Sequence, residues 1–160
     1  MPGAPRYSPQ PSTNGTAVLK VPCAVFTIFQ RGALATGGAM LIGLLGIAGL
    51  LRPDPRGYGT HQGLGLPPCT VVALYGIRCP ACGMTTSWSH LVRGRIWSAC
   101  RANSGGTFLG LLALTSGPWM LISGVRGRWW IGIPSETLVV SIGIAVVAVT
   151  LGDWIVRFGA

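Results

Sequence analysis

The chain has 160 residues, of which 49% are hydrophobic and only 9% are charged. Typical globular proteins carry about 25% charged residues, because a surface in contact with water needs many charges of both signs. The composition therefore excludes an ordinary soluble domain and predicts that lipid surrounds much of the chain.

The formal net charge of +9 is the other unusual feature of the composition. Such a charge can indicate nucleic-acid binding, but the sequence contains no recognised nucleic-acid-binding motif. The arginines instead flank apolar segments, where they would face anionic lipid headgroups. We therefore expect the bilayer, and no nucleic acid, to be a partner.

Residues 1–32 are predicted to form a disordered tail and a lead-in to the first apolar segment. The first twenty residues contain four prolines together with Gly, Ser, Thr and Asn, and lack an apolar run. Such a composition cannot bury enough apolar surface to offset the entropy of ordering.

Three segments, 33–51, 105–124 and 137–156, are predicted to be transmembrane helices. Each has 19 or 20 residues with at most one acid, and such a helix would be about 28–30 Å long, which matches the hydrocarbon core. A loop, 125–136, and a short tail, 157–160, complete the predicted all-α membrane protein. The predicted third helix also contains Asp153, which is placed for an i,i+4 pair with Arg157.

Small residues recur every fourth position in two of these segments. They are Ala35, Ala39 and Gly43 in the first and Gly106 and Gly110 in the second. This spacing allows helix backbones to approach closely. Contacts within the chain, with a second copy or with another membrane protein would all explain it.

Basic residues near the segment ends predict the orientation. The tail and the second loop carry Lys20, Arg31, Arg126 and Arg128, and the opposite side carries Arg52, Arg56, Arg93, Arg95, Arg101 and Arg157. The positive-inside rule favours a cytoplasmic first loop and an amino terminus outside.

The central loop, 52–104, contains most of the residues that could carry chemistry. Its apolar run 69–77 is too short to span and is predicted to be a strand-like piece or a re-entrant arm. A helix is expected after Cys79, with Pro80 in its first turn and an apolar face that lies at the membrane interface. Asn103 is placed to cap the second span.

The motif GIRCPACGMTT, preceded by PPC and followed by RAN, resembles the mark of a family of small bacterial membrane proteins of unknown function. The matching positions are Cys69, Gly76, Cys79, Pro80, Cys82, Gly83, Thr85 and Asn103. Thr86, Arg95 and Ser104 depart from the family pattern of arginine, aspartate and proline. The resemblance implies an integral protein of the bacterial inner (cytoplasmic) membrane and gives no reaction.

Three interpretations of the cysteines remain open. Cys69, Cys79, Cys82 and His90 could bind Zn²⁺ or cuprous copper, with His61, Cys100 or a water as other choices for the fourth ligand. Cys79 and Cys82 could instead exchange disulfides in a membrane oxidoreductase, with the pKa of Cys79 lowered by Arg78 and by a helix start. The motif could also be purely structural, as a small buried corner. The sequence favours a non-enzymatic scaffold or accessory subunit.

Overall fold

The structure is a computed structural model that describes residues 26–132 and 134–158, and every regular element in those ranges is helical. Three helices of 23 residues each are long and apolar enough to cross a membrane: α1 (Ile28–Leu50), α5 (Ser104–Arg126) and α6 (Glu136–Phe158). The predicted all-α class and its three candidate spans are therefore confirmed. Most of the predicted tail, residues 1–25, lies outside the described residues.

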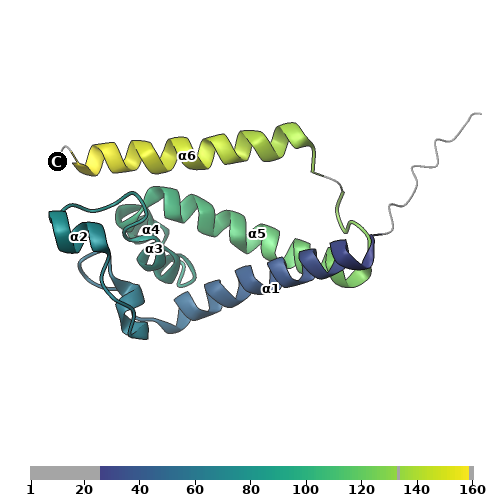
Figure 1. The fold of residues 1–160 in the computed structure, drawn as a ribbon, viewed down its shortest axis with the longest axis horizontal. Coiled ribbons are helices and arrows are strands. Elements are labelled where there is room, and N and C mark those ends of the chain that lie inside the picture. The colour runs from purple at the N-terminus through teal and green to yellow at the C-terminus, as the bar shows by residue number, and fades with distance from the viewer. Residues whose placement is uncertain (1–25, 133, 159–160) are drawn as a thin grey trace, which may run out of the picture.

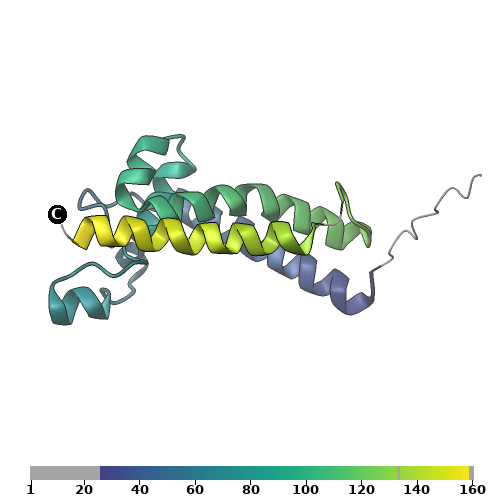
Figure 2. The same ribbon diagram turned by 90° about the horizontal axis from the view of Figure 1, so that it is seen from above.

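Four short helices lie between α1 and α5 in the sequence. They are η1 (Thr60–Leu64), α2 (Thr70–Tyr75), α3 (Met84–Leu91) and α4 (Ile96–Ala102). Figures 1 and 2 place all four at one end of the long helices, where α1 ends, α5 begins and α6 ends. The alternative of a strand in residues 69–77 is wrong, because most of that run forms α2.

The first long helix begins earlier than the uncharged segment that predicted it. Thr27 and Gln30 form a capping box around the first turn of α1, which fixes its start. Arg31 then lies inside the helix and donates hydrogen bonds to the carbonyls of Gly124 and Val125. A charged residue in the first turn is tolerated because it binds the end of a neighbouring helix.

Helices α1 and α5 pack closely through small residues. A Cβ atom on Gly38 would lie 2.5 Å from the backbone nitrogen of Leu121, and one on Gly124 would lie 2.6 Å from that of Ala35. The two backbones therefore approach as the small-residue pattern predicts. Gly43 has nothing within 4 Å of that position, so the contact face is rotated away from part of the predicted stripe.

Helix α3 lies between α1 and α5 at the end where these two helices diverge (Figure 1). Gly106 and Gly110 of α5 face it, since a Cβ on Gly110 would lie 2.7 Å from Leu91. In the part of the chain that the structure describes, this small-residue face is thus covered by the chain's own α3.

Three hydroxyl-bearing residues of α3 point inward and not to the surface. Thr86, Ser87 and Ser89 are fully buried. Each has a partner: Thr86 pairs with the hydroxyl of Thr60 at 2.7 Å, Ser87 with the hydroxyl of Thr107 at 2.8 Å, and Ser89 with the Leu51 carbonyl at 2.7 Å. Hydrogen-bonded hydroxyls can be buried at little cost.

Helix α6 packs against α5 on the side away from α1 (Figure 1). Gly105 provides the close approach, opposite Thr150, and none of the described residues of α6 is buried. The predicted ion pair between Asp153 and Arg157 forms near its end. That end lies beside the cysteines.

Candidate metal centre

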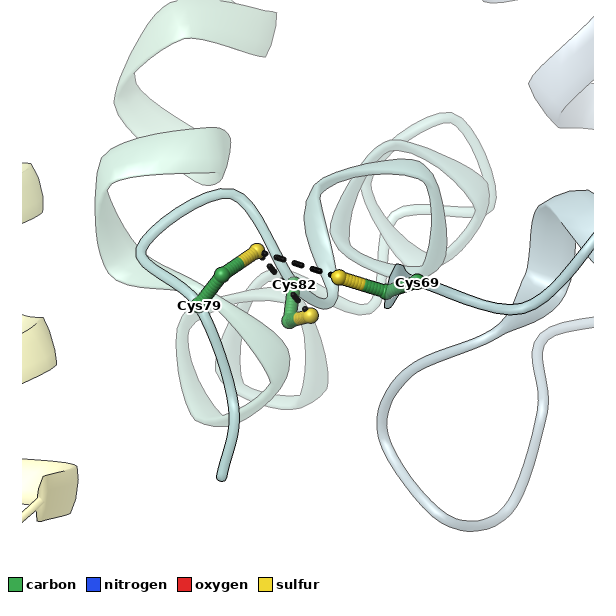
Figure 3. A group of neighbouring side chains, drawn as sticks. All are labelled: Cys69, Cys79 and Cys82. Carbon is green, nitrogen blue, oxygen red and sulfur yellow. Dashed lines mark hydrogen bonds between the residues drawn. The ribbon is translucent and has the colours of Figure 1, made fainter. Parts of the chain in front are cut away.

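Three cysteines converge at the end of the molecule where the short helices lie. The Sγ atom of Cys79 is 3.1 Å from that of Cys82 and 3.6 Å from that of Cys69, and all three sulfurs lie within 4.8 Å of one another (Figure 3). All three are free thiols. We call them the thiol cluster.

Two short segments bring these residues together. Cys69 immediately precedes α2 and takes its N-cap position, and Gly76 ends that helix in the left-handed conformation. Residues 79–82 form a turn in which the Cys82 N–H donates to the Cys79 carbonyl at 3.0 Å. Gly83, also left-handed, then takes the N-cap position of α3. Two turns that depend on glycine therefore bring the three sulfurs close together.

The expected helix start at Cys79 is wrong, because α3 begins only at Met84. The Arg78 guanidinium binds the Gly57 carbonyl at 3.0 Å and lies 4.6 Å from the centre of the Tyr58 ring. The cysteine that stands at a helix start is Cys69. The argument for a helix dipole acting on Cys79 therefore fails.

Asn103 joins the turn to the transmembrane helix that follows it. Its Oδ1 accepts from the Gly106 N–H at 2.6 Å, which confirms the predicted cap of α5. Its Nδ2 donates to the carbonyls of Pro80 at 2.9 Å and Cys82 at 3.1 Å. Asn103 is fully buried, so one amide fixes both the helix start and the turn.

Two residues of α6 hold the same turn, a contact that the sequence did not indicate. Trp154 Nε1 donates to the Arg78 carbonyl at 2.8 Å, and Arg157 Nη1 lies 3.3 Å from the Cys82 carbonyl. Three carbonyls of the motif, those of Arg78, Pro80 and Cys82, thus receive hydrogen bonds from α6 or from the N-cap residue of α5. The turn is held by its backbone, which leaves its thiols available.

The thiol cluster lines a cavity of about 200 Å³. His61, Met84, Thr85 and Thr86 line it as well. The His61 Nε2 atom lies 3.2 Å from the Pro67 carbonyl. A histidine and a thioether therefore share this cavity with three thiols.

Comparison with known proteins identifies only this part of the chain. Residues 69–116 match the family model described as protein of unknown function (DUF2752). The predicted resemblance to a family of unknown function is thereby confirmed. No curated protein and no solved structure gives a significant match to the chain.

The DUF2752 segment contains the whole thiol cluster, Asn103 and the first half of α5. His90 belongs to it too, but lines a different cavity together with Arg78, Arg95 and Arg101. His61 precedes the segment and lines the cavity of the cluster. The structure thus brings together three of the four predicted ligands. Of the alternatives for the fourth, His61 lines the same cavity but is not among the ligand atoms that lie close to one another.

The thiols of the DUF2752 segment differ in their surroundings. Burial, together with the hydrogen bonds that the Cys82 thiol donates to Cys79 and Cys69, raises the pKa of Cys82 to about 12. The backbone N–H groups of the first turn of α2, that of Val72 above all, lower the pKa of Cys69. Without a positive ion among them, the three thiols would not all be ionised at neutral pH.

Proposed function

We propose that this integral membrane protein, of the bacterial inner membrane, binds one thiophilic metal ion at Cys69, Cys79 and Cys82. The ion is Zn²⁺ or Cu⁺, since thiolates favour these two. The role is non-enzymatic: a scaffold or accessory subunit whose corner between the transmembrane helices is fixed by the metal. Three helices that are long and apolar enough to cross a membrane support the location.

The single observation that carries this proposal is the mutual distance of the three sulfurs. Ligands about 2.3 Å from a tetrahedral zinc ion lie about 3.8 Å from each other. Cys69 and Cys79 are 3.6 Å apart, and Cys79 and Cys82 are 3.1 Å apart. Small rotations of the cysteine side chains would therefore produce three metal ligands without moving the backbone.

The fourth ligand differs between the two metals. Zinc would take His61, which lines the same cavity, or a water in that cavity. Cuprous copper needs only the three thiolates, and Met84 offers a thioether nearby. If zinc is bound with His61 as the fourth ligand, His61→Ala weakens its binding, whereas copper binding is unchanged.

Charge also favours a bound metal over three separate thiols. Three thiolates with Zn²⁺ carry a net charge of −1, and the Arg157 guanidinium is hydrogen-bonded to the carbonyl of Cys82. Arg78 is the immediate neighbour of Cys79 in the chain. Because Arg157 is paired with Asp153 and the Arg78 guanidinium binds the Gly57 carbonyl, the charge that stabilises three thiolates would come mainly from the metal ion itself.

Metal analysis of protein purified in detergent tests the proposal. We expect one metal ion per chain in the wild type and none in Cys69→Ser, Cys79→Ser or Cys82→Ser. Cys100→Ser is the matched control, since Cys100 lies outside the cluster, and it should keep its metal. A metal-free wild type, or equal loss in Cys100→Ser, would contradict the proposal.

Thiol–disulfide exchange is the second candidate function, and the 3.1 Å between the sulfurs of Cys79 and Cys82 favours it. A disulfide between them would release two protons and pass two electrons to a partner disulfide or a quinone. A metal-free protein with a reversible Cys79–Cys82 disulfide in cells would support exchange in place of metal binding.

A further inference from the structure

A second cavity, of about 380 Å³, lies beside the thiol cluster at the same end of the molecule. The two are separated by a thin wall: Gly83, which lines the first, packs against the carbonyls of Gly57 and Ala102, which line the second. No cysteine lines the second cavity in the described part of the chain. Its chemistry is therefore distinct from that of the cluster.

Positive charge dominates the second cavity. Its charged and titratable lining residues are Asp54, Arg56, Arg78, His90, Arg95 and Arg101. Asp54 is bound to Arg56 at 2.7 Å, so that this pair is neutral. Arg78, Arg95 and Arg101 remain, and no carboxylate among the described residues that line the cavity is left to balance them.

Two buried nitrogen atoms of its lining residues lack a hydrogen-bond partner. They are Nε of Arg78 and Nδ1 of His90. A buried donor without a partner is costly and calls for a ligand or water. The Nη2 atom of Arg78 donates a hydrogen bond to the Gly57 carbonyl. This contact fixes the side chain, while its Nε atom still has no hydrogen-bond partner.

The pKa of His90 is also affected by the positive charge around this cavity. Burial, and the charges of Arg95 and Arg93, lower the pKa of its imidazole. His90 is then neutral at pH 7, and can still donate one hydrogen bond. The cavity is thus lined by three arginines without a carboxylate partner and by one imidazole, and the Arg101 guanidinium also lies 5.4 Å from the centre of the Trp97 ring.

We propose that this second cavity binds the phosphate group of a phosphorylated ligand. Guanidinium groups match the oxygens of phosphate in pairs, and three of them around one cavity concentrate the attraction. The volume accommodates a phosphate group with part of its substituent. The site is independent of the metal, because it uses none of the thiols.

The phosphate group can come from a lipid headgroup or from a soluble phosphate. Helix α4 presents Trp97 and Ile96, which are 72% and 56% exposed, next to Arg95 and Arg101. All three long helices have one terminus at this end (Figure 2), where headgroups would lie. Exposed apolar residues beside basic ones are typical of contact with anionic lipid.

Binding measurements on the full-length protein in an uncharged detergent test the proposal. The two probes are inorganic phosphate, followed by calorimetry, and phosphatidylglycerol, followed by native mass spectrometry with phosphatidylcholine as the reference lipid. We expect saturable binding of at least one probe. Saturation by phosphate without saturation by phosphatidylglycerol identifies a soluble source, and saturation by phosphatidylglycerol identifies a headgroup.

Variants assign the binding to this cavity. The double variant Arg95→Gln, Arg101→Gln should weaken binding at least tenfold. The double variant Arg95→Lys, Arg101→Lys should weaken binding less, because lysine keeps the positive charge but cannot donate two hydrogen bonds to one phosphate as a guanidinium does. Arg128 is exposed and follows the last residue of α5, which ends at the other end of the bundle (Figure 1), so Arg128→Gln should bind as the wild type does. All variants should keep the metal content of the wild type. Absence of saturable binding to both probes, or equal weakening in Arg128→Gln, would overturn the proposal.

Discussion

At Gly83 two backbone carbonyls approach the place where a side chain would begin. A Cβ atom there would lie 2.5 Å from the Ala102 oxygen and 2.7 Å from the Gly57 oxygen, at a φ of +91°. Gly76 has a similar φ of +68° but nothing within 4 Å. A side chain at Gly76 would therefore cause backbone strain alone, whereas a side chain at Gly83 would cause both backbone strain and a steric clash.

We expect Gly83→Ala to lower the free energy of unfolding by roughly 2–4 kcal/mol, since strain and overpacking add. Gly76→Ala carries the left-handed strain alone and should cost about 1–2 kcal/mol. Denaturation in mixed micelles measures both. Gly83→Ala should also lose metal, because its backbone cannot keep the turn beside Cys82 in place. Equal losses of stability in the two variants would contradict this account.

The sequence predicted the thiol cluster at the level of single residues, and the reason is local. Cys79, Pro80 and Cys82 make one turn, and Asn103 caps the helix that directly follows it. Trp154 and Arg157 escaped prediction because they bind backbone carbonyls 75 or more residues away. Every residue has a backbone carbonyl, so no pattern of residue types in the sequence indicates which carbonyl will accept such a hydrogen bond.

The two histidines show the same limit. His90 is close to the cysteines in the sequence and was the favoured fourth ligand, yet it lines the second cavity. His61 lies in a glycine-rich stretch and lines the first. Only the path of the chain around η1 decides which imidazole lies near the thiols, and separation in sequence does not determine it.

At the scale of elements, arginines bind the carboxyl ends of helices. Arg31 binds carbonyls in the last turn of α5, and Arg93 donates to the Gly49 and Leu51 carbonyls at the end of α1, at 2.8 and 2.7 Å. Arg157 lies 3.4 Å from the Ala102 carbonyl at the end of α4. These ends have unpaired carbonyls and negative partial charge. Part of the large positive charge therefore stabilises the fold itself.

Helix lengths and the use of small residues followed from the sequence, because hydrophobic length and glycine spacing are properties of one helix. The rotation of each helix did not, since it depends on its neighbours. Ala35 lies in the contact between α1 and α5, whereas Gly43 has open space and Gly110 faces α3. Likewise the sequence of α3 does not show that neighbouring elements enclose its hydroxyls, whose partners are Thr60, Thr107 and the Leu51 carbonyl.

Gly38 and Gly43 give a matched pair on α1. We expect Gly38→Ala to force α1 and α5 apart and to destabilise the protein by about 1–3 kcal/mol, as overpacking does. Gly43→Ala meets no atom within 4 Å and should be neutral or stabilising by up to about 1 kcal/mol, since alanine favours helix. Thermal unfolding in detergent compares the two. A larger loss in Gly43→Ala would show that its face is covered in the native protein.

For the whole molecule, the two ends of the bundle differ in what they carry. One end holds the thiol cluster, the second cavity and the short helices, and the other holds the start of α1 and the loop between α5 and α6 (Figure 1). Seven arginines belong to the first end: Arg52, Arg56, Arg78, Arg93, Arg95, Arg101 and Arg157. Positive charge of this kind favours the cytoplasmic side.

Orientation determines which chemistry the cysteines can perform. The cytoplasm keeps thiols reduced, and stable disulfides form outside it. If the cysteine end is cytoplasmic, three reduced thiols are available to a metal ion. If it faces outward, the sulfurs of Cys79 and Cys82, 3.1 Å apart, would be oxidised. The positive-inside expectation and the metal proposal therefore depend on one arrangement of the bundle.

Reporter fusions measure that arrangement in bacterial cells. Green fluorescent protein joined after the last residue should fluoresce, and alkaline phosphatase joined there should be inactive, because α6 ends beside the cysteines (Figure 1). Insertion of either reporter between α5 and α6 is the control, and should give the reverse pattern, since a span separates the two sites. Active phosphatase after α6 together with inactive phosphatase in the loop would place the thiols outside the cytoplasm. That outcome would contradict the predicted orientation and favour disulfide exchange over metal binding.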